Sequence, residues 1–135
     1  MSEQNVKVVK RAVDAWKRGD IEGLLAVYHP EVVWDFSHFD GWPEEQVIVG
    51  ADAVRAFLEQ WRSTFGAYEY EVDEYIDAGD QVVVLCRQGG RGRDSTLPVI
   101  MELAQVVTIA DGWYVRVENW SDRQAALDAV GVSST

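Results

Sequence analysis

Apolar side chains recur at helical spacing in three stretches of the chain. The first stretch predicts an amphipathic helix over residues 3–18, ended by Gly19, since glycine readily adopts the left-handed conformation of a helix stop. The second predicts a short helix that Asp20 caps and that does not continue past Pro30. The third, GADAVRAFLEQWRSTFG, predicts a longer helix over residues 50–66.

Strand-like runs, rich in β-branched and aromatic residues, occupy much of the remaining chain. EVVWDF, residues 31–36, predicts a first strand between the second and third helices. Four further strands are predicted at about residues 67–77, 81–89, 96–109 and 113–120. Turn-forming segments separate these four, so they are expected to pair as an antiparallel sheet. If AGD is a three-residue hairpin loop, Asp77 faces Gln81, Ile76 faces Val82 and Val72 faces Cys86.

The closing segment predicts a fourth helix and completes an α+β order of elements. Ser121 and Gln124 form an S-x-x-Q capping box before this helix, and Gly131 ends it. Helices followed by an antiparallel sheet differ from the alternating βαβ order of nucleotide-binding folds. The chain has 135 residues, which suits a single domain over residues 1–135.

Composition and charge narrow the possible partners and location. The net charge is −11, and residues 69–80 hold six carboxylates without one Lys or Arg, which argues against nucleic-acid binding. No apolar stretch is long enough for a membrane span, and the N-terminus has no secretory signal, so we expect a cytoplasmic protein that does not bind membranes. Cys86, the only cysteine, excludes an internal disulfide and is expected to be a buried, inert thiol.

The segment WDFSHFDGW, residues 34–42, places acids among aromatic side chains. Asp35 lies between Trp34 and Phe36, where loss of hydration would raise its pKa and make it a better base near neutral pH, although an Asp here also suits a structural cap. His38 lies three positions on, on the opposite face unless the strand bends at Ser37. No two histidines have the spacing of a helical zinc motif, so no metal site is predicted.

Three motifs, together with this order of elements, resemble a known superfamily. They are RGDIEGLLAVYHPEVVWD, GADAVRAF, and DGWYVRVENWSD with its AALDAVG ending. Over residues 5–131 the chain resembles the nuclear transport factor 2-like superfamily, especially SnoaL-like polyketide cyclases and ketosteroid isomerase. The resemblance implies a cone-shaped α+β barrel, in which N-terminal helices pack in a strongly curved, mostly antiparallel sheet around a pocket. It also implies a homodimer and chemistry without a cofactor.

The resemblance suggests roles for individual residues. Asp35 matches the place of the isomerase's general base, and Tyr28 matches a tyrosine of its hydrogen-bond network. Gln105 stands where the isomerase has a carboxylic acid that donates to an oxyanion, while Ala12 replaces its oxyanion tyrosine, which argues against steroid isomerisation. His38 is a candidate proton donor. The residues expected to line the pocket are Trp16, Trp34, Trp42, Phe57, Trp61, Met101, Glu118 and Trp120.

Two functions remain open from the sequence. In the first, the chain is a cofactor-independent isomerase, cyclase or dehydratase, and Asp35 takes a proton from a hydrophobic carbonyl or polyketide-like substrate. In the second, the same shell is a non-catalytic module for ligand binding or dimerisation. Both predict an apolar or cyclic small molecule as the ligand. Tyr75, Val83 and Leu85 are candidates for the apolar part of a dimer surface.

Overall fold

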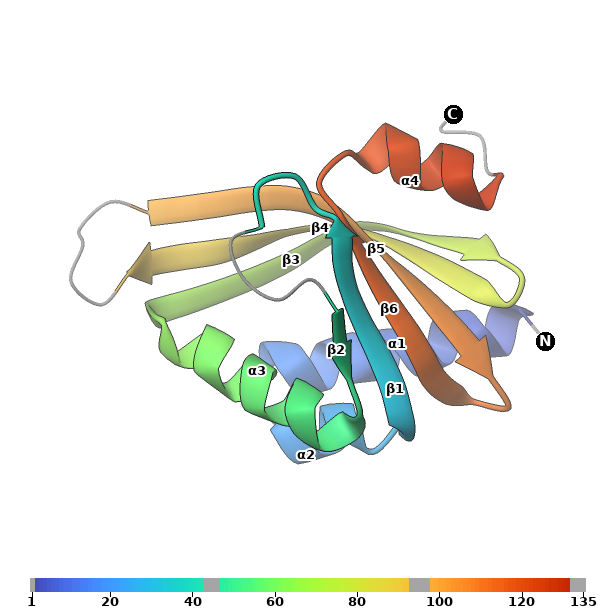
Figure 1. Ribbon diagram of the computed structural model, residues 1–135, viewed down its shortest axis with the longest axis horizontal. Coiled ribbons are helices and arrows are strands. Elements are labelled where there is room, and N and C mark those ends of the chain that lie inside the picture. The colour runs from blue at the N-terminus through green and yellow to red at the C-terminus, as the bar shows by residue number, and fades with distance from the viewer. Residues whose placement is uncertain (1, 43–46, 93–97, 132–135) are drawn as a thin grey trace.

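The computed structural model describes residues 2–42, 47–92 and 98–131, which form an α+β fold (Figure 1). Its elements in chain order are α1 (Ser2–Lys17), α2 (Ile21–Leu25), β1 (Tyr28–His38), β2 (Val47–Val49), α3 (Ala51–Ser63), β3 (Phe65–Ala78), β4 (Gln81–Gly92), β5 (Pro98–Ala110), β6 (Trp113–Trp120) and α4 (Arg123–Val130). The strands form one sheet in the order β2-β1-β6-β5-β4-β3. All neighbours are antiparallel except β1 and β6, which are parallel.

The helices divide between the two faces of the sheet. Helices α1, α2 and α3 lie together below the curved sheet in Figure 1, and α4 lies above it. The larger core cluster is buried on the first side, and a smaller one, centred on Val83, Val106 and Leu127, is buried beneath α4. Within the described residues, no helix has the length and hydrophobicity that a bilayer span requires.

The predicted helices form, with differences at three of their ends. The third helix, predicted over residues 50–66, ends at Ser63, because Phe65 already belongs to β3. Gly19 and Gly131 have φ angles of 80° and 76°, in the left-handed region that favours glycine after a helix. The second helix stops at Leu25, because Tyr28 already belongs to β1. The last helix is capped by Asp122, whose side chain accepts from the amide of Ala125, and not by Ser121 as the S-x-x-Q pattern predicted.

The register of the β3–β4 hairpin differs from the prediction near its turn. Ala78 pairs with Gln81, so the loop has two residues, and Asp77 faces Val82 where Gln81 was expected. Ile76 accordingly faces Val83, not Val82. An irregularity in β3 between Val72 and Glu74 adds one residue and restores the predicted pairing of Val72 with Cys86. The bulge therefore compensates for the shorter loop.

Helix α4 covers the surface that the sequence suggested for dimerisation. Val83 has no exposed surface, and Leu85 packs against the cluster beneath α4. Tyr75 packs against the larger core cluster. The three side chains therefore do not form one exposed apolar patch. Cys86 is buried, as predicted, and burial raises the pKa of its thiol to about 11.

Candidate functional site

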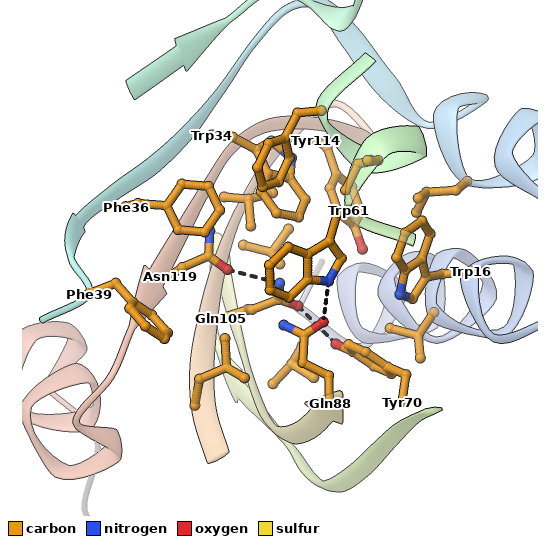
Figure 2. Close-up of a pocket in the computed structure, with 18 of the residues that line it drawn as sticks. Trp16, Trp34, Phe36, Phe39, Trp61, Tyr70, Gln88, Gln105, Tyr114 and Asn119 are labelled. Atoms are coloured by element: carbon orange, nitrogen blue, oxygen red, sulfur yellow. Dashed lines mark hydrogen bonds between the residues drawn. The ribbon is translucent and has the colours of Figure 1, made fainter. Parts of the chain in front are cut away.

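A hollow between the sheet and helices α1–α3 is the candidate site (Figure 2). Aromatic and aliphatic side chains form most of its wall. Of the residues predicted to line the pocket or to act in it, those that line it are Trp16, Tyr28, Trp34, Trp42, Phe57, Trp61, Met101 and Gln105. About 710 Å³ of empty space lies between the side chains and in the open mouth, but only about 50 Å³ admits the centre of a water molecule. Aromatic rings therefore fill most of the hollow and leave room for a few waters at most.

A directional chain of uncharged polar groups crosses the floor of this pocket. The Tyr70 hydroxyl donates to Oε1 of Gln105 at 2.9 Å. Nε2 of Gln105 donates to Oδ1 of Asn119 at 3.0 Å, and Nδ2 of Asn119 donates to the Asp35 carbonyl at 3.5 Å. Because a carbonyl can only accept, it sets the orientation of the Asn119 amide, which in turn sets that of Gln105. One N–H of Gln105 remains for another acceptor.

A second polar chain lies nearer the pocket mouth. The indole N–H of Trp16 donates to the Tyr68 hydroxyl, which donates to Oε1 of Gln88. The indole N–H of Trp61 donates to the same oxygen at 3.3 Å. Two donors at Oε1 orient the Gln88 amide so that its NH₂ group points away from them (Figure 2). Gln88 thus presents a hydrogen-bond donor on the pocket wall.

The pocket wall carries no charged side chain among the described residues. No Asp, Glu, His, Lys or Arg lines it. Its ionisable groups are the hydroxyls of Tyr28, Tyr70 and Tyr114, and burial raises the pKa of each above its usual value. These hydroxyls therefore stay protonated at neutral pH. Tyr28 stacks on Tyr114, with 4.9 Å between ring centroids, so the predicted hydrogen-bonding tyrosine also supplies a flat apolar surface.

Stacked rings close the side of the pocket near the segment that follows β1. Phe36 and Trp42 are parallel, with centroids 3.9 Å apart and planes inclined by 2°. Trp42 also contacts Trp61 at 5.9 Å, and Trp61 stacks with Phe57 at 6.3 Å. The indole N–H of Trp42 is buried without a hydrogen-bond partner in the described part of the chain. Trp42 therefore offers a further unused donor beside the hollow, in addition to Gln88 and Gln105.

Asp35 does not line the pocket, and this corrects the expected chemistry at that position. Trp34 and Phe36 turn into the hollow, so Asp35 between them points to the other face of β1. There its carboxylate accepts from the Ser37 amide at 2.7 Å and pairs with the Arg116 guanidinium. Burial alone would raise the pKa of Asp35, but the hydrogen bonds from Ser37 and the charge of Arg116 outweigh it and lower the pKa. The predicted rise in pKa is therefore wrong.

His38, Glu118 and Trp120 gather on this same outer face. The pairing of β1 with β6 is irregular between Asp35 and His38, and this bulge brings the two side chains to one face, where regular alternation would separate them. The His38 ring stacks on Trp120 with centroids 3.9 Å apart, and its Nε2 lies 3.6 Å from Oε2 of Glu118. Glu118 and Trp120 were expected in the pocket, but β6 turns Val117 and Asn119 inward instead.

Sequence reasoning missed several polar residues of the pocket. Tyr70, Gln88 and Asn119 were not among the predicted site residues, yet each belongs to one of the two polar chains. Alternation along β4 could have placed Gln88 on the same face as Val84, which also lines the pocket. Asn119 was missed because the other face of the last strand, with Glu118 and Trp120, was expected to line the pocket.

Comparison with known proteins places this geometry in a family. A family model for the SnoaL-like domain matches residues 9–117. The chain belongs to this family. Its α+β architecture is that of nuclear transport factor 2-like proteins, as predicted. No curated protein matches the sequence.

Several solved structures are similar to this SnoaL-like protein in fold. A Jannaschia sp. CCS1 protein, provisionally named a SnoaL-like polyketide cyclase, is 24% identical, with a TM-score of 0.76 over 98% of this chain and 94% of that one. TerC, co-crystallised with polyporic acid, is 23% identical, with a TM-score of 0.74 over 94% and 98% of the two chains. A ketosteroid isomerase-like protein from Catenulispora acidiphila DSM 44928, in complex with trimethylamine, is 12% identical, with a TM-score of 0.72 over 93% of each chain.

Proposed function

We propose that this SnoaL-like protein binds a small, planar, uncharged molecule that carries a hydrogen-bond acceptor such as a carbonyl oxygen. The observation that carries the proposal is the pocket wall, which is aromatic and aliphatic and holds no charged side chain within the described residues. A charged ligand would lose its hydration there without gaining a counter-ion. A flat apolar ligand loses little and gains contact with stacked rings.

The hydrogen-bonding groups of the pocket favour a ligand that accepts. Gln88 has an NH₂ group turned away from its two donors, and Trp42 has an indole N–H without a described partner. Gln105 keeps a second N–H beyond the one that it donates to Asn119. A carbonyl oxygen can accept from such groups, whereas a ligand that only donates leaves them unpaired.

Binding requires aromatic side chains to move, because the open cavity of about 50 Å³ is smaller than the roughly 300–1,000 Å³ of pockets for drug-sized ligands. Trp61 is the side chain best placed to do so. It is only partly buried, and a single hydrogen bond to Gln88 holds its indole N–H. The ligand would take the place of this ring, while Tyr68 would still donate to Gln88. Tryptophan fluorescence should therefore change on binding.

The experiment compares three compounds of similar shape: 1-indanone, which carries a carbonyl, indane, which does not, and indane-2-carboxylate, which is charged. We expect 1-indanone to bind about five-fold more tightly than indane, since one hydrogen bond contributes about 1 kcal/mol. We expect the carboxylate to bind weakest. Calorimetry and tryptophan fluorescence would measure the affinities. Tighter binding of the carboxylate than of the ketone would contradict the proposal.

Gln88→Glu tests the donor directly, because the carboxylate keeps an oxygen for Tyr68 and Trp61 while it replaces the NH₂ group. We expect this variant to lose the preference for 1-indanone over indane. Gln60→Glu, on the exposed surface of α3, is the matched control and should keep the preference. Equal loss in both variants would mean that added charge alone, and not the lost donor, weakens binding.

Proton transfer with Asp35 as the base is the second candidate function. The low pKa of Asp35 supports it to the extent that the carboxylate is ionised and able to accept a proton. Its position on the outer face supports it less, since β1 separates it from the pocket. Asp35→Asn distinguishes the two functions. NMR would follow the exchange of the α-protons of a carbonyl compound with D₂O, and exchange that the wild type catalyses and this variant does not would favour catalysis. Unchanged binding of 1-indanone without any exchange would favour a binding protein.

A further inference from the structure

The outer face of the β1–β6 pair brings three potential metal ligands together, on the opposite side of the sheet from the pocket. Asp35, His38 and Glu118 each have one carboxylate oxygen or imidazole nitrogen that lies within 4.8 Å of those of the other two. Asp35 and Glu118 are register partners in the parallel pairing, so they share a face, and the bulge after Asp35 adds His38 to it. Each ligand comes from a strand, which limits how far it can move.

The chemistry of these atoms suits a divalent transition-metal ion. Zn²⁺ binds imidazole nitrogen at about 2.0–2.1 Å and carboxylate oxygen at about 2.0–2.2 Å. Two ligands on one ion are then at most about 4.4 Å apart, so two of these atoms that lie as far apart as 4.8 Å would have to approach each other by about 0.4 Å or more. The exposed ring of His38 and the partly exposed side chain of Glu118 can make this adjustment. We propose that Asp35, His38 and Glu118 bind one divalent transition-metal ion.

Glu118 provides a second reason to place a cation here. Its side chain is only 18% exposed, yet its one ion-pair partner in the described part of the chain is His38, at 3.6 Å, and the carboxylate of Asp35 lies within 4.8 Å. No hydrogen-bond donor contacts its carboxylate among the described residues, and a partly buried carboxylate without a donor is unfavourable. A metal ion between His38 and Glu118 would supply the missing positive charge. The sequence predicted no metal site, because its histidines lack helical zinc spacing and Glu118 was expected to line the pocket.

Neighbouring groups would orient the ligands. The Ser37 amide holds Oδ1 of Asp35, which leaves Oδ2 as the ligand atom, and Trp120 holds the His38 ring by stacking. Arg116 opposes the ion, because its guanidinium pairs with Oδ2 of Asp35. Its side chain is 41% exposed and can swing into solvent. The site therefore has a built-in competitor, and removing that competitor should strengthen metal binding.

The experiment titrates untagged protein with ZnCl₂ by calorimetry and with CoCl₂ by NMR. We expect one Zn²⁺ per chain, and paramagnetic Co²⁺ should broaden the imidazole signals of His38 but not those of His29, the only other histidine. His29 already uses Nδ1 to accept from the Glu31 amide, and it lies at the other end of β1. Equal broadening of both rings, or no Zn²⁺ binding, would overturn the proposal.

Matched variants make the assignment specific. His38→Gln and Glu118→Gln should each weaken Zn²⁺ binding at least ten-fold, whereas His29→Gln should leave it unchanged. Arg116→Gln should strengthen it several-fold, since it removes a competing cation from Asp35. Circular dichroism would confirm that each variant is folded. Unchanged affinity in both His38→Gln and Glu118→Gln, or weaker binding in Arg116→Gln, would place the ion elsewhere.

Discussion

The two faces of the β1–β6 strand pair have opposite electrostatic character, although they come from the same few residues. The inner face presents Trp34, Phe36 and Asn119 to a pocket without charged side chains among the described residues. The outer face presents Asp35, which pairs with Arg116. Strand alternation alone separates the two environments, since successive side chains point to opposite faces. A single-residue shift in register would therefore exchange a neutral pocket for a charged one.

Asn119→Asp should have the largest effect, because it places a carboxylate on the neutral face. Asn119 is 1% exposed, and no cation lies in the pocket wall of the described chain. We expect a loss of about 3 kcal/mol in the free energy of unfolding at pH 8. Because burial would raise the pKa of the new carboxyl, the loss should shrink as the pH falls toward 4. Urea unfolding at both pH values measures it, and a loss that is equal at pH 8 and pH 4 would contradict this reasoning.

Arg116→Gln tests the charged face and should have the next largest effect. It leaves the buried carboxylate of Asp35 without its cation, and since Arg116 is partly exposed we expect a loss of about 1–2 kcal/mol at pH 7. The folded-state pKa of Asp35 is lowered, so its stabilising contribution is present above about pH 4 and is lost as the pH falls through the folded value. The variant and the wild type should therefore converge in urea unfolding as the pH falls below the folded-state pKa of Asp35. In a protein that already carries Asp35→Asn, Arg116→Gln should lower the free energy of unfolding much less.

Tyr70→Phe examines the neutral hydrogen-bond chain with a smaller change. It removes the hydroxyl that donates to Gln105 and should cost about 1 kcal/mol in the free energy of unfolding. Tyr75→Phe, five residues further along β3, is the control, because no described group bonds to its hydroxyl. Thermal and urea unfolding would compare the two. A similar cost for both substitutions would mean that the polar chain contributes no specific stability.

Glu118→Gln should have the smallest effect on stability in the absence of a metal ion. Glu118 lies 3.6 Å from His38, whose side chain is 39% exposed, and such partly exposed ion pairs contribute little. We expect a change below about 0.5 kcal/mol in urea unfolding at pH 7. With Zn²⁺ present, the difference between variant and wild type should grow, because the ion would bind the wild type more tightly and stabilise it more. A large loss without metal would show that the pair itself stabilises the fold.

The fold could be read from the sequence because its signals are local or repeat along the chain. Helical spacing, turn residues and alternation located the helices and the four long strands, and the three motifs indicated the cone-shaped architecture. The errors lie where tertiary contacts determine the local structure or the strand register. Tyr28 has a helical position in the sequence but pairs with Tyr114 of β6, and the β3 bulge shifts the hairpin register. Neither feature has a local signal.

The site was predictable in composition but not in orientation. The aromatic wall could be expected from the tryptophans, and most of the predicted residues do line the pocket. The direction of Asp35 could not be derived, because alternation assigns relative faces and not which face is inward. His38 depended on a bulge that only the pairing of β1 with β6 reveals. Whether Asp35, His38, Tyr28 and Gln105 take part in a reaction stays a prediction.

The parallel pairing of β1 with β6 also bears on how the chain folds. Trp34 aligns with Val117, which is synthesised about 80 residues later, and until then β1 has only the short strand β2 as a hydrogen-bonded neighbour. The β3–β4–β5 meander, by contrast, joins strands that are adjacent in sequence and can form early. A nascent chain that ends before β6 would leave this edge of β1 without its hydrogen-bonded partner and be prone to aggregate. We therefore expect completion of the last strand to be the step that commits this protein to its native state.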